Sequence, residues 1–595
     1  MNAFVGGGSG EEEPAPLVIV EGFLCAASSL IWGTFDEPLS QGSQYRQRSS
    51  ASYSQTKHSE EATATNGRQQ PRRVVFAPIG PVSSIHDRAC ELFYGLQGGR
   101  VDYGEAHSRA HGHGRYGKTF GKPLLPGWGN DFALRSGDDS SSSSAGQARR
   151  GAHFMGHSLG GLTIVKLYEL LSAGFFDEAL GITSDSRKSE DATSPSPASF
   201  LMLSLTTVSS PHRGTPLVYS LGSIPGKDPQ VRFLSPGDCL AKLVHVISWA
   251  RRLPMLGLDA WLPDFFAEAW AFASSKDENE KENEKENERS KRWQLQEWMG
   301  IGKLLAQLWK SDWAEGRDCA PWDCTFEERS RREEEAGEGA IWGLQGRQLG
   351  QLHGQKVWLR SYAASVTAPK SSEMDRQEQT PLAGLLSPLA FTARLLRHFD
   401  YGNAPPPPLR KKNYRSLRGG SDSGYCSSAE DDAEDKNGTM HASDEEKVRR
   451  DWQANDGVVP FASQFHPSDC MRGHCQHEAW VPHAGMPDEG TDTRTLARYA
   501  VDSAAASSLS LLGFNSKSGI GSPQLRPKPP GSDLADGPAP LPKPNLWHVC
   551  ELEGTTHASL VPFWTGSEKQ RAFWFDLGAW LHDVEMAQSD RVIPL

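Results

Sequence analysis

The sequence predicts an α/β protein with a mostly parallel central sheet. Short apolar runs recur along the chain, and longer polar or helical stretches separate them. Runs that are apolar at every position fit strands buried on both faces, as in parallel sheets. Strands that alternate with helical patterns favour an open α/β sheet. The predicted strand regions are residues 17–20, 74–77, 153–155, 200–208, 357–362 and 546–552.

Composition and charge exclude several classes of protein. The chain has 595 residues, 37% of them hydrophobic and 23% charged, and a net charge of −12 at pH 7. This charge provides no global field that favours nucleic acid. No segment reaches the ~20 apolar residues that a transmembrane helix needs. The first residues lack the basic and apolar parts of a secretory signal, so the sequence favours a cytoplasmic protein.

Low-complexity segments interrupt the chain. They are rich in Ser, Pro, Gly or charged residues and cannot bury enough apolar surface to fold alone. We therefore expect one domain over residues 14–595, with these segments as disordered insertions that take no part in its core. The segments are residues 41–70, 136–149, 184–197, 274–292, 403–446 and 515–544.

One cluster of cysteines and histidines resembles part of a metal-binding knuckle. Cys470 and Cys475 lie close in sequence to His466, His474 and His477. The C-x4-C spacing lacks the second cysteine pair that such knuckles use. The pattern therefore favours reduced thiols at the surface.

The sharpest local signal is HFMGHSLGG, in which Gly156, Ser158 and Gly160 form G-x-S-x-G. A serine on a sharp strand-to-helix turn has strained backbone geometry, and flanking glycines remove steric clashes there. An apolar run precedes the motif and a helical pattern follows it, whereas an inert serine in a glycine-rich turn needs neither. We therefore predict that Ser158 is the nucleophile of an α/β-hydrolase fold.

A nucleophilic serine needs a base, and the base needs an orienting carboxylate. In α/β-hydrolases the acid and then the histidine follow the serine along the chain. Asp456, in ANDGVVP, suits the acid because Asp-Gly forms a turn after a strand end. His557, in ELEGTTHASL, follows the last apolar run. Position alone does not select it among 19 histidines.

Longer segments carry a resemblance to a known family. Residues 78–120 contain PIGPVSSIHDRACE and DYGEAHSRAHGHGRYG, and GHSLGG, SSPHRGTPL and NDGVV follow later. Together they resemble the thermostable lipases of Bacillus and Staphylococcus type, whose sequences carry similar blocks. Matching blocks extend from Pro16 to about Leu581, and the stretch from Thr556 matches more weakly.

The resemblance implies a carboxylic ester hydrolase with Ser158 as nucleophile, Asp456 as acid and His557 as base. It also implies an oxyanion hole formed by the backbone N–H groups of Phe23 and Leu159, where each donor typically contributes ~3 kcal/mol. The implied substrates are long-chain acylglycerols or other lipid esters at a lipid interface.

The resemblance further implies a structural zinc ion in a small extra domain that includes residues 78–120. Two aspartates and two histidines hold this ion in the family. Asp87, His107 and His113 match three of these positions, and LDAW gives Asp259 as the fourth. Zinc accepts such mixed imidazole and carboxylate ligands. Without the resemblance, a solvated histidine-rich loop is the better interpretation.

Three details qualify these implications. Glu21-Gly22 stands where the family has His-Gly, which is expected to alter hydrogen bonding behind the oxyanion loop. The residues after His557, ASLVPFW, contain no carboxylate, so no calcium is predicted at the family's calcium position. His111 lies between two predicted zinc ligands and is not included among them.

Residues 233–272 are the predicted lid region. Four apolar residues fall at helical spacing, with Lys242 and His245 off their face, until Pro254 breaks the pattern. The pattern alone equally fits an ordinary amphipathic surface helix. A position between the Ser158 and Asp456 segments agrees with the family's lid. The four residues are Leu240, Leu243, Val244 and Ile247.

Two other functions remain open. A phospholipase or acyltransferase would use the same three residues. A hydrolase-fold scaffold without activity would use the insertions to bind partners, and the exchange at Glu21 favours it. The presence of Ser158, Asp456 and His557 together argues against the scaffold.

Overall fold

In the computed structural model, the described residues are 13–24, 32–55, 71–129, 151–182, 195–251, 264–266, 302, 304–336, 356–366, 388–402, 404, 406, 452–467, 475–480 and 541–589.

Seven strands form one central sheet in the order β2-β1-β5-β6-β7-β9-β8. Every neighbouring pair of strands in this sheet is parallel. The predicted α/β fold with a mostly parallel sheet is therefore confirmed, and each of the six predicted apolar runs coincides with a strand. The strands are β1 (Leu17–Val20), β2 (Val74–Phe76), β5 (Ala152–His157), β6 (Met202–Val208), β7 (Trp358–Ser365), β8 (Cys475–Ala479) and β9 (Trp547–Glu553).

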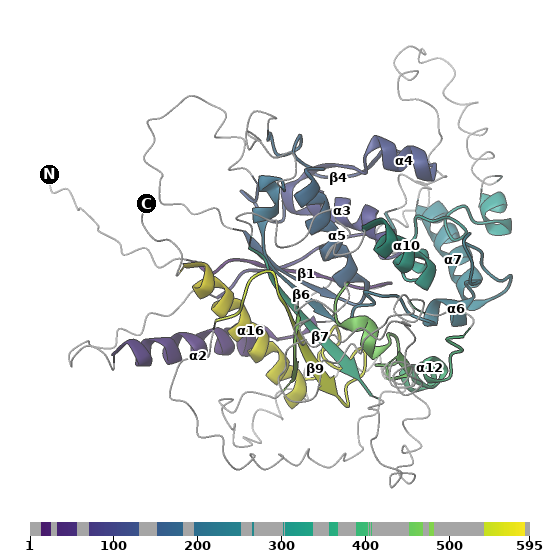
Figure 1. Cartoon of the computed structure of the whole chain (residues 1–595). Helices are drawn as coiled ribbons and strands as arrows, with labels where there is room; N and C mark the ends of the chain where they lie inside the picture. Colours follow the sequence, from purple (N-terminus) through teal and green to yellow (C-terminus); the bar gives the residue numbers. More distant parts are fainter. Residues whose placement is uncertain are drawn as a thin grey trace, which may run out of the picture.

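Both faces of the sheet are covered by helices, which explains why the strands are apolar at successive positions. Val18 and Val20 of β1 belong to the core under α3 (Ile85–Gln97) and α5 (Leu159–Ala173), whereas Leu17 and Ile19 belong to the core under the other pair of helices. That second pair is α2 (Asp36–Gln55) and α16 (Glu568–Ser589). Figure 1 shows the two pairs on opposite faces of the sheet.

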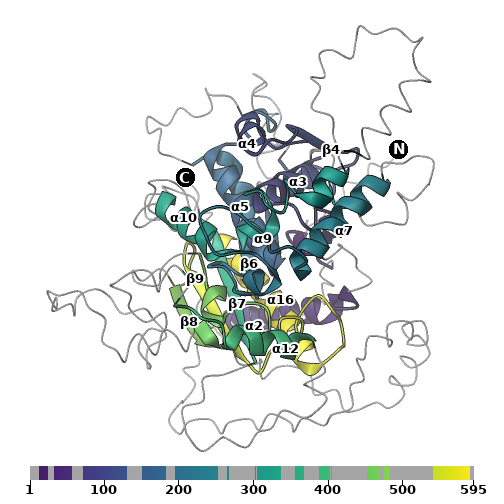
Figure 2. The same ribbon diagram turned by 90° about the vertical axis from the view of Figure 1, so that its right-hand side faces the viewer.

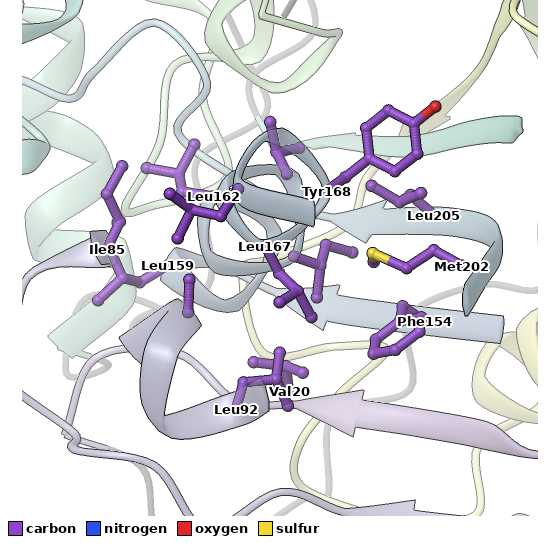
Figure 3. Close-up of a cluster of buried hydrophobic side chains, with 14 of the residues drawn as sticks. Val20, Ile85, Leu92, Phe154, Leu159, Leu162, Leu167, Tyr168, Met202 and Leu205 are labelled. Carbon is purple, nitrogen blue, oxygen red and sulfur yellow. The ribbon is translucent and has the colours of Figure 1, made fainter. Parts of the chain in front are cut away.

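The core under α5 holds the sequence motif in position. Leu159, Leu162 and Leu167 of α5 are buried beside Phe154 of β5 and Leu205 of β6 (Figure 3). Replacing a buried leucine of this kind with alanine typically costs about 2–5 kcal/mol. The first turn of α5, directly after Ser158, is therefore fixed against the sheet.

Helix α2 corrects the predicted insertion at residues 41–70, because the helix continues to Gln55. A Cβ atom on Gly42 would lie 1.9 Å from the carbonyl oxygen of Phe575 in α16. The Ser43 hydroxyl donates a hydrogen bond of 2.9 Å to the carbonyl oxygen of Gly578. Small residues thus let the two helices approach closely, although the polar composition of this stretch predicted no contribution to the core.

The other predicted insertions mostly fall on residues that are not described. Residues 136–149 and 274–292 lie wholly outside the described part of the chain. The last residues of the predicted insertion at 184–197 belong to the folded domain. Ser196 is buried and caps a short 3-10 helix, η3 (Pro197–Leu201). Its hydroxyl accepts a hydrogen bond from the backbone N–H of Ala198 at 3.2 Å.

Edge strand β8 was not predicted. Its sequence, CQHEA, has no apolar run, and among the described strands only β9 pairs with it. Parallel pairing sets Cys475 opposite Trp547 and His477 opposite Val549. Cys475 is 1% exposed, so the prediction of a surface thiol was wrong for this residue.

Smaller elements lie beside the sheet. β3 (Gly99–Asp102) and β4 (Tyr116–Phe120) form an antiparallel pair that flanks α4 (Glu105–His111). The other helices gather on the right-hand side of Figure 1, the side that faces the viewer in Figure 2. They are α6 (Leu217–Leu221), α7 (Pro236–Arg251), α9 (Ala320–Asp323), α10 (Phe326–Ala336) and α12 (Pro388–Arg397). Among the described helices, none combines the length and the apolar character needed to span a bilayer.

Helix α7 lies in the predicted lid region, but its inward face differs from the prediction. Leu243 is 53% exposed, while His245, which the pattern put off the apolar face, is buried. The His245 ring bonds to the Ser311 hydroxyl at 2.7 Å. Polar partners in the neighbouring 311–322 segment thus decide which face is inward. The described inward residues are Ala241, Val244, His245 and Ser248.

Candidate active site

Ser158 lies on a sharp turn between β5 and α5, with φ 55° and ψ −125°. A positive φ is strained for any residue with a side chain and typically costs about 1–3 kcal/mol. A Cβ atom on Gly160 would lie 2.0 Å from the carbonyl oxygen of Val20, and one on Gly161 would lie 2.0 Å from the Ser210 hydroxyl. The turn therefore requires glycines next to Ser158. A parallel sheet that ends in this turn is the α/β-hydrolase arrangement that the sequence predicted.

His557 and Asp456 meet although 101 residues separate them. The Nδ1 atom of His557 lies 2.8 Å from the Oδ2 atom of Asp456, and the backbone N–H of His557 donates to the Asp456 carbonyl oxygen at 2.9 Å. Asp456 is fully buried, and its Oδ1 atom accepts hydrogen bonds from the backbone N–H groups of Val458 and Val459. The carboxylate therefore has one oxygen for the backbone and one for the imidazole.

The two residues meet because neighbouring parallel strands end at the same edge of the sheet. His557 follows β9, and β9 pairs with β7. The residue after β7, Val366, donates its backbone N–H to the carbonyl oxygen of Asn455 at 2.9 Å. This bond holds the Asp456 turn beside the carboxyl end of β7.

His157 joins this pair to the serine turn, and the sequence analysis gave it no role. Its Nε2 atom lies 3.0 Å from the carbonyl oxygen of His557, and the two rings are 4.8 Å apart between centroids. Burial, and then the nearby His557, lower the pKa of His157 to about 3. His157 is therefore neutral near pH 7, and its Nε2–H donates to His557. The only sequence signal was its place directly before Ser158.

The loop after β1 approaches the same serine. A Cβ atom on Gly22 would lie 2.8 Å from the Ser158 Cβ and 3.3 Å from its Oγ. Phe23 follows, packed against two of the apolar cores. The predicted oxyanion-hole residues, Phe23 and Leu159, thus lie on the two segments that adjoin Ser158.

Glu21, the exchanged residue behind this loop, has partners of its own. It is buried, and its carboxylate accepts a hydrogen bond from the indole N–H of Trp32. Its backbone carbonyl oxygen accepts one from the Arg88 guanidinium. The Arg88 side chain also donates to the Thr163 hydroxyl of α5 at 2.9 Å. The loop is therefore tied to α5, and the exchange at Glu21 is accommodated.

A group that could hold a metal ion lies at the small antiparallel pair. Asp87, His107, His113 and Asp318 each bring one ligand atom within 4.8 Å of the others. The Nε2 atom of His107 is 3.2 Å from Asp87 Oδ1 and 3.3 Å from Asp318 Oδ1. The Nε2 atom of His113 is 3.2 Å from Asp318 Oδ2 and 4.0 Å from Asp87 Oδ1.

The fourth member of this group is not a residue that the sequence predicted. Asp259 lies outside the described residues, and the carboxylate beside the two histidines is that of Asp318. Asp318 precedes α9, and nothing around it in the sequence resembles a ligand motif. It comes close because the 311–322 segment packs against α7 and Val82. His111, left out of the predicted set, is not in this group.

Burial and neighbouring charges shift the pKa values of the residues in this group. Burial lowers the pKa of His107, but its hydrogen bonds to Asp318 and Asp87 outweigh burial and raise the pKa to about 9. Burial, and then the charge of Asp318, raise the pKa of Asp87 to about 6. Two buried carboxylates side by side repel each other, so a cation between them is favourable.

Comparison with known proteins agrees with the resemblance. Residues 62–225 match the family model described as "Lipase-like, C-terminal domain". The chain is 34% identical to a lipase of Staphylococcus hyicus over 155 residues, which are 25% of this chain and 20% of the relative. It is 37% identical to "Lipase 1" of Staphylococcus aureus over 142 residues, which are 23% of this chain and 18% of the relative. The matched part thus spans about a fifth of these curated relatives.

Solved structures with a similar arrangement include two bacterial proteins. The crystal structure of Staphylococcus hyicus lipase has a TM-score of 0.47 and 17% identity, with 98% of this chain and 100% of that chain covered. EstA from Clostridium botulinum has a TM-score of 0.43 and 19% identity, with 96% and 88% covered.

Proposed function

We propose that this protein hydrolyses carboxylic esters of lipids, with Ser158 as the nucleophile. The observation that carries the proposal is one arrangement at the carboxyl ends of the strands. Ser158 lies on a positive-φ turn before α5, and the His557–Asp456 pair is bonded to the histidine next to it. Sequence similarity to a staphylococcal lipase supports the same function, as does the match of residues 62–225, which include Ser158, to a lipase-like family model.

In the proposed mechanism, Asp456 holds the proton of His557 on Nδ1, so that the lone pair lies on Nε2. This nitrogen accepts the proton of Ser158, and the serine oxygen attacks the ester carbonyl. Backbone N–H groups of Phe23 and Leu159 stabilise the oxyanion, and the α5 dipole favours the same negative charge. The alcohol leaves with the proton from His557, and water releases the acid by the same route.

We propose zinc as the ion of the Asp87 group. Zn–N and Zn–O bonds are about 2.0–2.2 Å, and a tetrahedron of such bonds has edges of about 3.3–3.6 Å. Of the four distances between an imidazole nitrogen and a carboxylate oxygen in this group, three are 3.2–3.3 Å and one is 4.0 Å. Four protein ligands leave no position for substrate, so the ion would be structural and would join α3 and α4 to the 311–322 segment.

The proposed contact with a lipid interface rests on exposed apolar side chains at and before α7. Phe233 is 69% exposed, Leu234 is 70% exposed, and Leu243 is more than half exposed. Exposed large apolar side chains that are close together in a chain favour contact with an apolar surface. Helix α7 would then meet the lipid while the active site takes the ester.

Introducing a negative charge among the exposed apolar side chains of α7 tests the proposed contact with lipid. Leu243→Glu is expected to lower hydrolysis of an emulsified triacylglycerol at least tenfold, because a carboxylate resists transfer to lipid. Hydrolysis of a soluble short-chain ester should change less than twofold. Phe200→Glu, at an exposed residue of η3 before the amino end of the central strand β6, is the control and should change neither rate. Equal losses on both substrates with Leu243→Glu would remove the interface proposal.

Labelling with a fluorophosphonate probe tests the proposed function itself. The probe phosphonylates a serine only when an adjacent base activates it. The wild-type chain should be labelled with one probe per molecule, and Ser158→Ala should take up none. Ser210→Ala, a buried serine beside Gly161, should still be labelled. Equal label on the Ser158→Ala variant would assign the nucleophile to another serine. Wild type without label would exclude Ser158 as nucleophile and favour the non-catalytic scaffold.

A further inference from the structure

A second group of ligand atoms lies away from Ser158, at the edge of the sheet. His466, Cys475 and His477, here named the sheet-edge cluster, each bring one ligand atom within 4.8 Å of the others. Cys475 and His477 are two residues apart on β8, so their side chains point to the same face of the strand. His466 comes from another segment, two residues after the 3-10 helix η12 (Phe461–Gln464).

The cluster is enclosed by apolar and aromatic side chains. His466 and Cys475 are buried, and His477 is nearly so. The His466 ring stacks on Trp547, with centroids 6.2 Å apart and an interplanar angle of 22°. Phe465 meets the His477 ring edge to face at 5.0 Å. Side chains held this firmly keep their donor atoms close together without a large entropic cost on binding an ion.

A carboxylate next to the cluster orients one of its histidines. The Nδ1 atom of His477 lies 3.2 Å from Oε1 of Glu551 on the neighbouring strand β9. A hydrogen bond from Nδ1–H to this carboxylate puts the ring's lone pair on Nε2. Histidines that ligate metals almost always have such a partner, because it fixes the tautomer and makes the ligating nitrogen more basic.

We propose that the sheet-edge cluster binds a zinc ion through the Cys475 thiolate and the imidazoles of His466 and His477. Thiolate and imidazole are the ligands that zinc takes in proteins, and a set that includes sulfur disfavours magnesium and calcium. On binding, the Cys475 thiol loses its proton to solvent and the sulfur forms the bond to the metal. Water completes the coordination.

The site would hold the segment that carries Asp456. Ten residues along the chain separate Asp456 from His466, and Gln464 between them bonds to both Ala364 of β7 and Val459. A metal bond from His466 to β8 would anchor the far end of this segment to the edge of the sheet. The ion would therefore be structural, and it is separate from the Asp87 group, which contains no cysteine.

Cobalt substitution tests this site by a signal that the Asp87 group cannot produce. A Co²⁺ ion bound to thiolate has an intense near-ultraviolet charge-transfer band, whereas imidazole and carboxylate ligands give none. The full-length Asp318→Asn variant, titrated with Co²⁺, should develop this band with one ion per chain. Absence of the band would overturn the proposal without any further variant.

Further variants locate the signal. Cys475→Ser should abolish the band, and Glu551→Gln should weaken Co²⁺ binding about 10–100-fold, as loss of a ligand's carboxylate partner typically does. Cys239→Ser, at an exposed cysteine of α7, is the matched control and should keep the band. A band that survives in Cys475→Ser would assign the metal to another cysteine and refute the cluster. If Cys470→Ser then removed the band, Cys470 would be that cysteine.

Discussion

Asp456→Asn is expected to lower kcat on a soluble ester by about 10⁴-fold, the loss typical of this exchange in a serine hydrolase triad. Two backbone N–H groups bond to the Oδ1 position, so the amide oxygen of the variant should stay there. The amide NH2 then faces Nδ1 of His557 and forces the imidazole proton onto Nε2. That nitrogen can no longer accept the Ser158 proton.

The loss corresponds to about 5.5 kcal/mol of transition-state stabilisation. Steady-state kinetics on a soluble chromogenic ester would measure it. The variant should remain folded, because it keeps its volume and its backbone hydrogen bonds. Asp228→Asn, at a side chain that is 79% exposed and pairs with Arg317, is the control and should keep full activity. A loss below tenfold for Asp456→Asn would refute the role of Asp456 as the acid.

The second large effect is expected at the Asp87 group. Asp318→Asn should release one zinc ion per chain, because Asp318 contacts both imidazoles while an amide binds zinc poorly. An ion at 1,000 times its Kd adds about 4 kcal/mol to stability, and each kcal/mol shifts Tm by about 1–2 °C in a domain of more than about 300 residues. We therefore expect Tm to fall by about 5 °C.

Asp259→Asn is the matched control, since Asp259 was the ligand expected from the sequence. It should retain the metal and the Tm of the wild-type chain. Elemental analysis and thermal unfolding, before and after a chelator, measure both quantities. If Asp259→Asn released the ion and Asp318→Asn kept it, the assignment from the structure would be wrong and the assignment from sequence similarity right.

There is a physical reason why the sequence identified three members of the Asp87 group but not Asp318. Asp87, His107 and His113 lie within 27 residues of one another, so a short motif identified them together. Asp318 is more than 200 residues further on, and it reaches the histidines only because the 311–322 segment packs against α7 and Val82. Long-range packing of this kind leaves no local pattern in the sequence.

The same distinction applies to α2 and α7. Polar composition predicted an insertion at residues 41–70, yet Gly42 and Ser43 pack against α16, because a narrow face of small residues is enough for close helix contact. For α7, helical spacing predicted the helix, but the inward face followed the hydrogen bond between His245 and Ser311. Periodicity measures apolar side chains and misses polar partners that a neighbouring segment supplies.

By itself, the sequence determined the features that depend on neighbours along the chain. Apolar runs are strands because both faces of a parallel sheet are buried, and the Ser158 turn follows from glycines that alone fit the close backbone contacts around it. Only the tertiary structure decided which distant side chains meet. The pairing of β7 with β9 brings His557 to Asp456, the packing of one segment brings Asp318 to two histidines, and edge strand β8 buries Cys475 beside His466. These contacts depend on how elements pack in three dimensions, and a one-dimensional pattern does not encode that packing locally.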